Sequence, residues 1–210
     1  MNLIKTILLT RHGSTAYNEE ERLQGLIDIS INEKGARQAG LISQRLQDEP
    51  IEMIFHTPLT RTKQTAEIIN RYHQVKLGVV DSFMEIDMGE WEGRNFQQVV
   101  KENPDIYQQW ISDPQAVVPG GESFAQLYKR IRPGVDHILA SRFKCVLIVA
   151  HAMVNRAILG QLLGINPLSA RRFRTDHCSF SRLLVYETSA GRHTTADTWN
   201  SIDHLVHQEK

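Results

Sequence analysis

Short apolar segments alternate along this chain with amphipathic segments of helical period. The apolar segments that predict strands lie at residues 4–9, 51–55, 76–80 and 145–150. The segments whose apolar residues recur every three or four positions, and so predict helices, lie at residues 32–46, 59–72, 124–138 and 153–163. Strands that alternate with helices are typical of βαβ units, so the sequence predicts an α/β fold with a mainly parallel sheet.

Turn-forming and helix-breaking residues predict where several of these elements begin and end. Thr57 and Pro58 are expected to provide the N-cap and the first residue of the second helix. Pro133 predicts a break near Arg132, because a proline inside a helix removes a backbone hydrogen bond. The last two strand-like segments flank Ala190-Gly191 and predict an antiparallel hairpin at the edge of the sheet.

Residues 82–121 form a long stretch without a predicted strand. This stretch is rich in glycine, proline and tryptophan, and one or two short helices are expected between Asn95 and Ile111. A stretch of this length without sheet pairing is more often functional than a linker. Residues 1–210 are therefore expected to form a single domain with a lid-like helical insertion at about 82–121.

The composition narrows the possible partners. Lysine plus arginine number 24, as do aspartate plus glutamate, so no global positive field favours nucleic acid or an anionic membrane. An anion site must therefore be a local concentration of arginine and histidine. No apolar stretch approaches membrane-spanning length, and Cys145 and Cys178 are expected to be reduced thiols. These features predict a cytoplasmic protein without a nucleic-acid or membrane partner.

Residues suited to phosphate chemistry follow the ends of the predicted strands, directly or in the next loop: Arg11, His12, Arg61, Glu85 and His151. Because the carboxyl ends of parallel strands meet at one edge of a sheet, these side chains are expected to converge. Two guanidiniums can hold phosphate oxygens, and a protonated His151 would add a third donor.

Their proposed roles follow from ordinary acid–base and nucleophilic chemistry. His12 is expected to attack phosphorus while neutral, with its other ring nitrogen donating to a backbone carbonyl. Glu85 is expected to protonate the leaving alkoxide and then to activate water. Asn18 would add an amide donor at the mouth of the site.

Structural interpretations of these residues remain open. A histidine after a buried strand is often a satisfied core residue, and Arg61 at the start of a helix is often a solvated charge. Nine histidines are present, but none shows a metal-ligand spacing such as His-x-x-x-His. The two cysteines also lack the close spacing of a metal-binding cysteine pair. No metal and no cofactor are therefore expected.

Taken together, the motifs resemble those of the histidine phosphatase superfamily, the phosphoglycerate-mutase-like clan, over nearly the whole chain. The segments that carry the resemblance are Arg11-His12-Gly13, Thr57-Pro58-Leu59-Thr60-Arg61, Gly89-Glu90-Trp91-Glu92-Gly93, Pro119-Gly120-Gly121-Glu122-Ser123 and Val149-Ala150-His151. The resemblance implies a three-layer α/β/α sandwich, with a mainly parallel central sheet and an antiparallel edge strand. It also implies a phosphohistidine on His12 and no metal. The residues that it implies for catalysis or substrate binding are Arg11, His12, Asn18, Gln24, Gly25, Arg61, Glu85, His151 and Ala152.

Four residues depart from the family pattern and leave the substrate open. Ala152 replaces the usual glycine, Ser14 a glutamate or glutamine, Tyr17 a tryptophan and His56 a serine. Contacts to the leaving group are expected from among Arg22, His56, Arg94, Tyr107 and Asn155.

The sequence thus predicts a phosphomonoesterase for a small phosphorylated metabolite, similar to α-ribazole phosphatases and broad-specificity relatives. The alternatives are a cofactor-dependent phosphoglycerate mutase and a non-catalytic phosphate-binding module. A monomer and a homodimer are both compatible with the sequence.

Overall fold

A computed structural model describes residues 1–206 of the chain. Its centre is a six-stranded sheet with the strand order β3-β2-β4-β1-β5-β6. The strands are β1 (Asn2–Arg11), β2 (Met53–His56), β3 (Lys76–Val79), β4 (Cys145–Ala150), β5 (Phe180–Thr188) and β6 (Gly191–Ser201). The first four pair in parallel, whereas the hairpin of β5 and β6 pairs antiparallel at one edge. The predicted mainly parallel sheet with an antiparallel edge is therefore confirmed.

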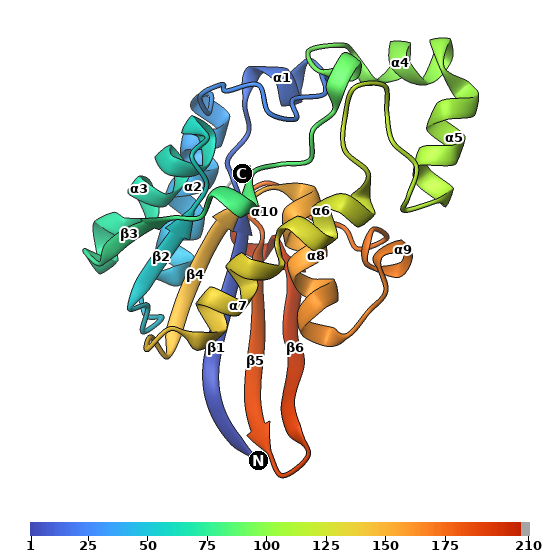
Figure 1. The fold of residues 1–210 in the computed structure, drawn as a ribbon. Helices are drawn as coiled ribbons and strands as arrows, with labels where there is room; N and C mark the ends of the chain where they lie inside the picture. Colours follow the sequence, from blue (N-terminus) through green and yellow to red (C-terminus); the bar gives the residue numbers. More distant parts are fainter. Residues whose placement is uncertain (207–210) are drawn as a thin grey trace.

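Helices cover both faces of this sheet, which gives the three-layer α/β/α arrangement (Figure 1). The α-helices are α1 (Ala16–Glu19), α2 (Glu33–Leu46), α3 (Thr60–His73), α4 (Phe96–Glu102), α5 (Pro104–Ser112), α6 (Phe124–Arg130), α7 (Arg132–Ala140), α8 (Ala152–Leu163), α9 (Pro167–Ala170) and α10 (Asp203–Val206). Two 3₁₀ turns, η1 (Asp81–Phe83) and η2 (Gly89–Trp91), lie between β3 and α4. No helix within residues 1–206 is both long and apolar enough to cross a membrane.

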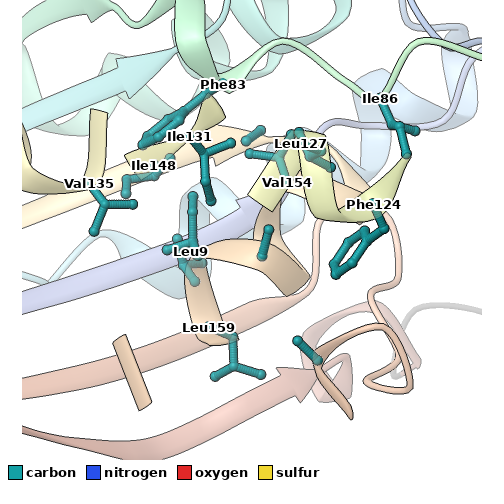
Figure 2. Close-up of a cluster of buried hydrophobic side chains, with 14 of the residues drawn as sticks. Leu9, Phe83, Ile86, Phe124, Leu127, Ile131, Val135, Ile148, Val154 and Leu159 are labelled. Atoms are coloured by element: carbon teal, nitrogen blue, oxygen red, sulfur yellow. The ribbon is translucent and has the colours of Figure 1, made fainter. Parts of the chain in front are cut away.

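The two faces of the sheet belong to two separate hydrophobic cores. In a strand, successive side chains point to opposite faces. Leu8 and Leu147 accordingly pack with Ile42 of α2 and Ile69 of α3. On the opposite face, Figure 2 shows Leu9 and Ile148 among side chains of α6, α7 and α8, such as Leu127, Val135 and Val154. Strands β1 and β4 are thus buried on both faces, and this packing holds their carboxyl ends in place.

The helix boundaries confirm one prediction and correct another. Helices α6 and α7 are separated at Ile131, as Pro133 at the start of α7 predicts. The predicted start of α3 was wrong, because its N-cap is Leu59 and its first residue is Thr60. The Asp28 carboxylate, from a distant loop, accepts hydrogen bonds from the backbone N–H and the hydroxyl of Thr60, each at 2.7 Å. A tertiary contact therefore caps α3 in place of a local one.

Segment 82–121 contains η2, α4 and α5, in agreement with the short helices predicted there. Helices α1, α4 and α5 lie beyond the carboxyl ends of the parallel strands (Figure 1). Residues from this segment therefore meet the loops that follow β1 and β4.

Candidate active site

A cavity of about 350 Å³ opens where the loops after β1, β2 and β4 meet segment 82–121. All but one of the predicted site residues line it, namely Arg11, His12, Asn18, Gln24, Gly25, Arg61, Glu85 and Ala152. The exception, His151, is fully buried directly behind the wall, and its ring centroid lies 5.4 Å from that of His12. The residues that the sequence predicts to converge therefore do meet.

His12 has the geometry of a neutral nitrogen nucleophile. The ring follows β1, and Nδ1 lies 2.8 Å from the carbonyl oxygen of Gly13, to which it can donate. This bond fixes the proton on Nδ1 and leaves the lone pair of Nε2 free. Burial, followed by the Arg61 and Arg11 cations, lowers the pKa of His12 well below its usual value. The ring is therefore neutral at pH 7.

His151 is held by a hydroxyl from the neighbouring loop. Its Nε2 lies 3.0 Å from Oγ1 of Thr57, which also accepts a hydrogen bond from the backbone N–H of Leu59 at 3.3 Å. When the Thr57 hydroxyl donates to Nε2, Nδ1 carries the ring proton. Among residues 1–206 this Nδ1 has no hydrogen-bond partner. In that tautomer His151 has one buried N–H that the described residues leave without an acceptor.

The protonated state expected for His151 is not what the structure favours. Burial is the main reason that the pKa of His151 lies well below its usual value, and the Arg61 and Arg11 cations lower it further. The imidazole is neutral at pH 7 and contributes a donor through its tautomer rather than through a charge.

Arg11 and Arg61 bring two buried cations to the cavity. Arg61 is 1% exposed, and its Nη atoms donate to the carbonyl oxygens of Ile27 and Gly25, each at 2.8 Å. Nη1 of Arg11 donates to the carbonyl oxygen of Thr175 at 3.1 Å. Burial lowers the pKa of Arg11 to about 10, so this guanidinium remains charged at neutral pH. Within the described residues neither arginine forms an ion pair, which leaves both charges available to an anion.

The start of α8 adds backbone donors on the same side. His151 is the N-cap of this helix, and its first residues, Ala152 and Met153, line the cavity. The first N–H groups of a helix have no intrahelical partner and carry a partial positive charge. This helix end therefore favours an anion in the cavity, together with the two guanidiniums.

The loop that carries His12 is packed tightly against the start of α2. A Cβ atom placed on Gly13 would lie 2.5 Å from the carbonyl oxygen of Gly35, and one on Gly35 would lie 2.1 Å from that of Ser14. The backbone N–H of Gly13 donates to Oγ1 of Thr65 at 3.0 Å, and this hydroxyl donates to the carbonyl oxygen of Arg61 at 2.7 Å. Glycine and threonine thus connect the loop that carries His12 to Arg61.

Glu85 enters the cavity from segment 82–121. Its Oε1 accepts a hydrogen bond from the N–H of Ile86 at 2.9 Å, and Oε2 lies 3.5 Å from the N–H of Met153. These contacts place the Glu85 carboxyl group in the cavity wall beside the start of α8.

Arg130 of α6, which the sequence did not single out, holds the Glu85 loop. Its guanidinium donates to the carbonyl oxygens of Ser82 and Met84 at 2.8 and 3.1 Å, and to that of Glu85 at 3.2 Å. It also forms an ion pair with Glu122, with a closest distance of 2.7 Å. No local motif marks these contacts, because an arginine on an amphipathic helix is usually a surface charge.

His177 was also missed, although its ring centroid lies 5.5 Å from that of His12. Burial and the Arg11 cation lower the pKa of His177 to about 2, so this ring is neutral as well. It does not line the cavity and packs beside the nucleophile. Its position just before the final hairpin gave no sequence signal for this contact.

Most of the five residues that the sequence suggested for contacts to the leaving group do not line the cavity. Arg22 lines the cavity, whereas His56, Arg94, Tyr107 and Asn155 do not. Nδ1 of His56 lies 2.7 Å from the carbonyl oxygen of Thr57, and Arg94 forms an ion pair with Glu102. Phe96, Trp110 and Met153 line the cavity in their place, apolar residues from segments expected to carry specificity but not singled out individually.

The described residues contain no group of three histidine, cysteine, aspartate or glutamate side chains arranged to hold a metal ion. The site contains arginines, histidines, the carboxyl groups of Glu85 and Glu21, and a helix N-terminus.

In a comparison with models of protein families, residues 7–200 match the model of the histidine phosphatase superfamily (branch 1). The chain belongs to the histidine phosphatase superfamily. Its relatives include phosphoserine phosphatase 1 of Hydrogenobacter thermophilus, which is 32% identical over 183 residues, covering 86% of this chain and 87% of the relative. A probable phosphoglycerate mutase GpmB of Yersinia enterocolitica is 34% identical over 184 residues, covering 87% and 86%.

Solved histidine phosphatase structures have the same fold. A mycobacterial glucosyl-3-phosphoglycerate phosphatase is similar with a TM-score of 0.86 and 25% identity, over 94% of this chain and 99% of that one. The resemblance read from the sequence motifs is therefore confirmed at the level of family and fold.

Proposed function

We propose that this protein is a phosphomonoesterase of the histidine acid phosphatase type that needs no metal and hydrolyses a small phosphorylated metabolite. The observation that carries this proposal is the state of His12. The ring is neutral, its Nδ1 proton is held by Gly13, and its free Nε2 lies in a cavity that also holds Arg11 and Arg61. A nucleophile and an anion site are thus combined in one cavity.

In the first step, Nε2 of His12 attacks phosphorus while Arg11, Arg61 and the N-terminus of α8 hold the phosphoryl oxygens. The new P–N bond forms as the P–O bond to the leaving group breaks, and the alkoxide takes the proton of Glu85. His151 donates its Nδ1–H to a phosphoryl oxygen. The products are the free alcohol, a phosphohistidine on His12 and a Glu85 carboxylate.

In the second step, the Glu85 carboxylate takes a proton from a water molecule, which attacks phosphorus. The P–N bond breaks, His12 returns to its neutral form, and inorganic phosphate leaves. Glu85 regains its proton in this step and is ready for the next substrate. Positioned acid–base catalysis of this kind contributes about 10²- to 10⁴-fold in rate.

Asn18, Gln24, Gly25 and Ala152 are proposed to surround the bound phosphate. Asn18 accepts hydrogen bonds at Oδ1 from the N–H and the hydroxyl of Thr15, at 3.1 and 3.0 Å. This arrangement leaves its amide nitrogen as the donor at the cavity. Because residues from 82–121 line the outer wall, we propose that this segment acts as a lid over a single catalytic domain.

The substrate is proposed to be a phosphorylated small molecule rather than a protein. Phosphoserine, phosphoglycerate and glucosyl-3-phosphoglycerate, the compounds in the names of the three relatives above, are all small phosphate esters. A cavity of about 350 Å³ is within the usual size range for small-molecule sites.

A phosphoglycerate mutase is the second candidate, because one relative of 34% identity carries that name. A mutase would return the phosphoryl group of His12 to a bound intermediate. A non-catalytic phosphate-binding module is less well supported, since the nucleophile, both arginines and the acid are all present in the cavity.

The test is the release of phosphate from p-nitrophenyl phosphate and from a panel of phosphorylated metabolites, without added metal and with a chelator present. The wild-type protein is expected to release phosphate, and His12→Ala is expected to lose this activity. An acid-labile phosphoenzyme should accumulate in rapid-quench experiments with the wild type and not with His12→Ala. Equal activity of the two proteins would contradict the proposal. Transfer from 2,3-bisphosphoglycerate to 3-phosphoglycerate without phosphate release would favour the mutase.

A further inference from the structure

Two arginines outside the proposed catalytic set contact residues of the cavity wall, although they do not line the cavity themselves. Nη1 of Arg156, on α8, lies 3.3 Å from Sδ of Met153, which lines the cavity. The guanidinium carbon of Arg171, which follows α9, lies 4.3 Å from the centre of the Trp110 ring, and Arg171 donates to the carbonyl oxygen of Trp110. Trp110 also lines the cavity.

The geometry of α8 directs the Arg156 side chain toward the cavity. Arg156 follows Met153 by three positions and Ala152 by four, so the three residues share one face of the helix. Long side chains on a helix lean toward its N-terminus, and here this direction leads to the cavity. The contact with Met153 agrees with this direction. The Arg156 charge is close enough to both Arg11 and Arg171 to lower the pKa of each.

Neither guanidinium has a direct acidic partner in the described part of the chain. Both side chains are half-buried, and within residues 1–206 neither forms an ion pair. Burial and the neighbouring Arg156 cation lower the pKa of Arg171 to about 10, and burial also lowers the pKa of Arg156. Charged side chains withdrawn from water are normally paired. Glu85 and Asp176 raise the pKa of Arg156 only from a distance, so two adjacent cations without a direct ion pair are suited to an anion from outside the chain.

A polar group in the same wall also lacks a partner. Trp110 is 7% exposed, and its indole Nε1–H is buried without a hydrogen-bond acceptor among the described residues. Nε of Arg156 is likewise buried without a partner. Unsatisfied buried donors are uncommon in folded proteins, so these two donors beside the cavity agree with a ligand-binding role for this wall.

We propose that Arg156 and Arg171 form a second anion subsite that binds a carboxylate on the leaving group of the substrate. This inference rests on the proposed phosphatase function and narrows its substrate class to phosphate esters of small hydroxy acids. A guanidinium matches a carboxylate in shape, because its planar fork of N–H groups can donate two parallel hydrogen bonds. The phosphate would be held by Arg11 and Arg61, and the carboxylate by the two outer arginines.

Matched pairs of substrates test this subsite. Glycerol 3-phosphate has the carbon chain and phosphate of 3-phosphoglycerate with a hydroxymethyl group in place of the carboxylate, and phosphoethanolamine lacks the carboxylate of O-phosphoserine. The wild-type enzyme is expected to show a kcat/KM at least tenfold higher for the carboxylate in at least one pair. Arg156→Met and Arg171→Met are each expected to reduce this preference about tenfold or more.

The control variant is Arg172→Met, which removes an exposed arginine next to the proposed subsite. It is expected to leave the preference unchanged. Arg156→Lys keeps the charge without the fork and is expected to restore part of the preference. If Arg156→Met fails to fold, Arg171→Met and Arg156→Lys carry the same comparison.

Two results would overturn the inference. One is a wild-type enzyme without preference for the carboxylate in either pair. The other is an equal loss on both members of a pair in the arginine variants, which indicates a structural role alone. Hydrolysis of p-nitrophenyl phosphate that depends on His12 reports on the proposed function separately. If this hydrolysis occurs without a carboxylate preference, only the second anion subsite is wrong.

Discussion

The hydroxyl of Thr57 offers a sharp test of the site, because it is the contact that fixes the proton on His151. Thr57 is fully buried, and its Oγ1 lies 3.0 Å from Nε2 of His151 and 2.8 Å from Oγ1 of Thr62. Thr57→Val keeps the branched shape and removes this oxygen. The ring then loses the partner that places its proton on Nδ1, the nitrogen proposed to donate to phosphate.

The magnitude follows from the groups that the substitution leaves unpaired. Nε2 of His151 and the N–H of Leu59 both lose a partner, whereas the hydroxyl of Thr62 keeps the carbonyl oxygens of Leu59 and Thr57 as acceptors. An unpaired buried polar group costs about 1–3 kcal/mol. If the same energy is lost in the transition state, kcat falls about 5- to 150-fold, since about 1.4 kcal/mol corresponds to tenfold. The melting temperature is expected to fall by about 2–4 °C for each kcal/mol.

The assay is steady-state hydrolysis of p-nitrophenyl phosphate together with thermal unfolding of each variant. Thr62→Val is the matched control, because it removes a hydroxyl from the same cluster that does not contact His151. Both variants are expected to lose stability, and only Thr57→Val is expected to lose kcat beyond that control. Thr57→Ser retains the oxygen and should recover most of the activity.

Equal kcat values for Thr57→Val and Thr62→Val would refute the reasoning. A serine variant as impaired as the valine variant would refute it too, because the oxygen would then not be the group that matters.

Four further expectations concern the acid, its support, the buried histidines and the nucleophile loop. Glu85→Gln is expected to slow the hydrolysis of alkyl phosphates about 10²-fold or more and that of p-nitrophenyl phosphate much less; an equal loss would exclude Glu85 as the proton donor. Arg130→Met, measured on the same two substrates, should reproduce part of this leaving-group dependence, since Arg130 holds the backbone of residues 82–85; loss of stability alone would count against that role. The pKa values of His12, His151 and His177 are lowered in the folded protein, so the unfolded chain binds more protons below pH 6.5. The free energy of unfolding should therefore fall on acidification, by about 1.4 kcal/mol per pH unit for each histidine. Urea titrations at pH 7 and pH 5 check this, and His177→Asn should make the pH dependence shallower. Gly35→Ala should lower the melting temperature and kcat together, because its Cβ would lie 2.1 Å from the carbonyl oxygen of Ser14, whereas Gly40→Ala on the same helix, where the Cβ meets nothing within 4 Å, should do neither.

Local patterns predicted the scaffold well because local physics determines it. The apolar run that ends at Ala150 reads as a buried strand, and β4 is buried along its whole length. Segment 32–46 reads as a helix, and α2 begins there, where the side chain of Asn32 accepts a hydrogen bond from the N–H of Gly35. The predicted meeting of residues at the strand ends followed from the parallel order of the sheet.

Local sequence patterns did not predict the contacts between distant segments of the chain. The start of α3 was misplaced because its capping carboxylate, Asp28, comes from another loop. Arg130 and His177 act on residues about 45 and 165 positions away, as the contacts with Glu85 and His12 show. The neutral state of His151 depends on burial among cations, which a sequence pattern does not report.

The ion pair and carbonyl contacts of Arg130 have a consequence for how this enzyme could be altered. One guanidinium fixes both the residues that precede Ile86 and the carboxylate of Glu122, so the intervening chain leaves and returns at a single anchored point. Exposed positions of that stretch can therefore be substituted while Glu85 and Glu122 stay anchored, provided that its core residues Trp91, Val99 and Val118 are kept. Selectivity could diverge in this way without a change in the chemical step.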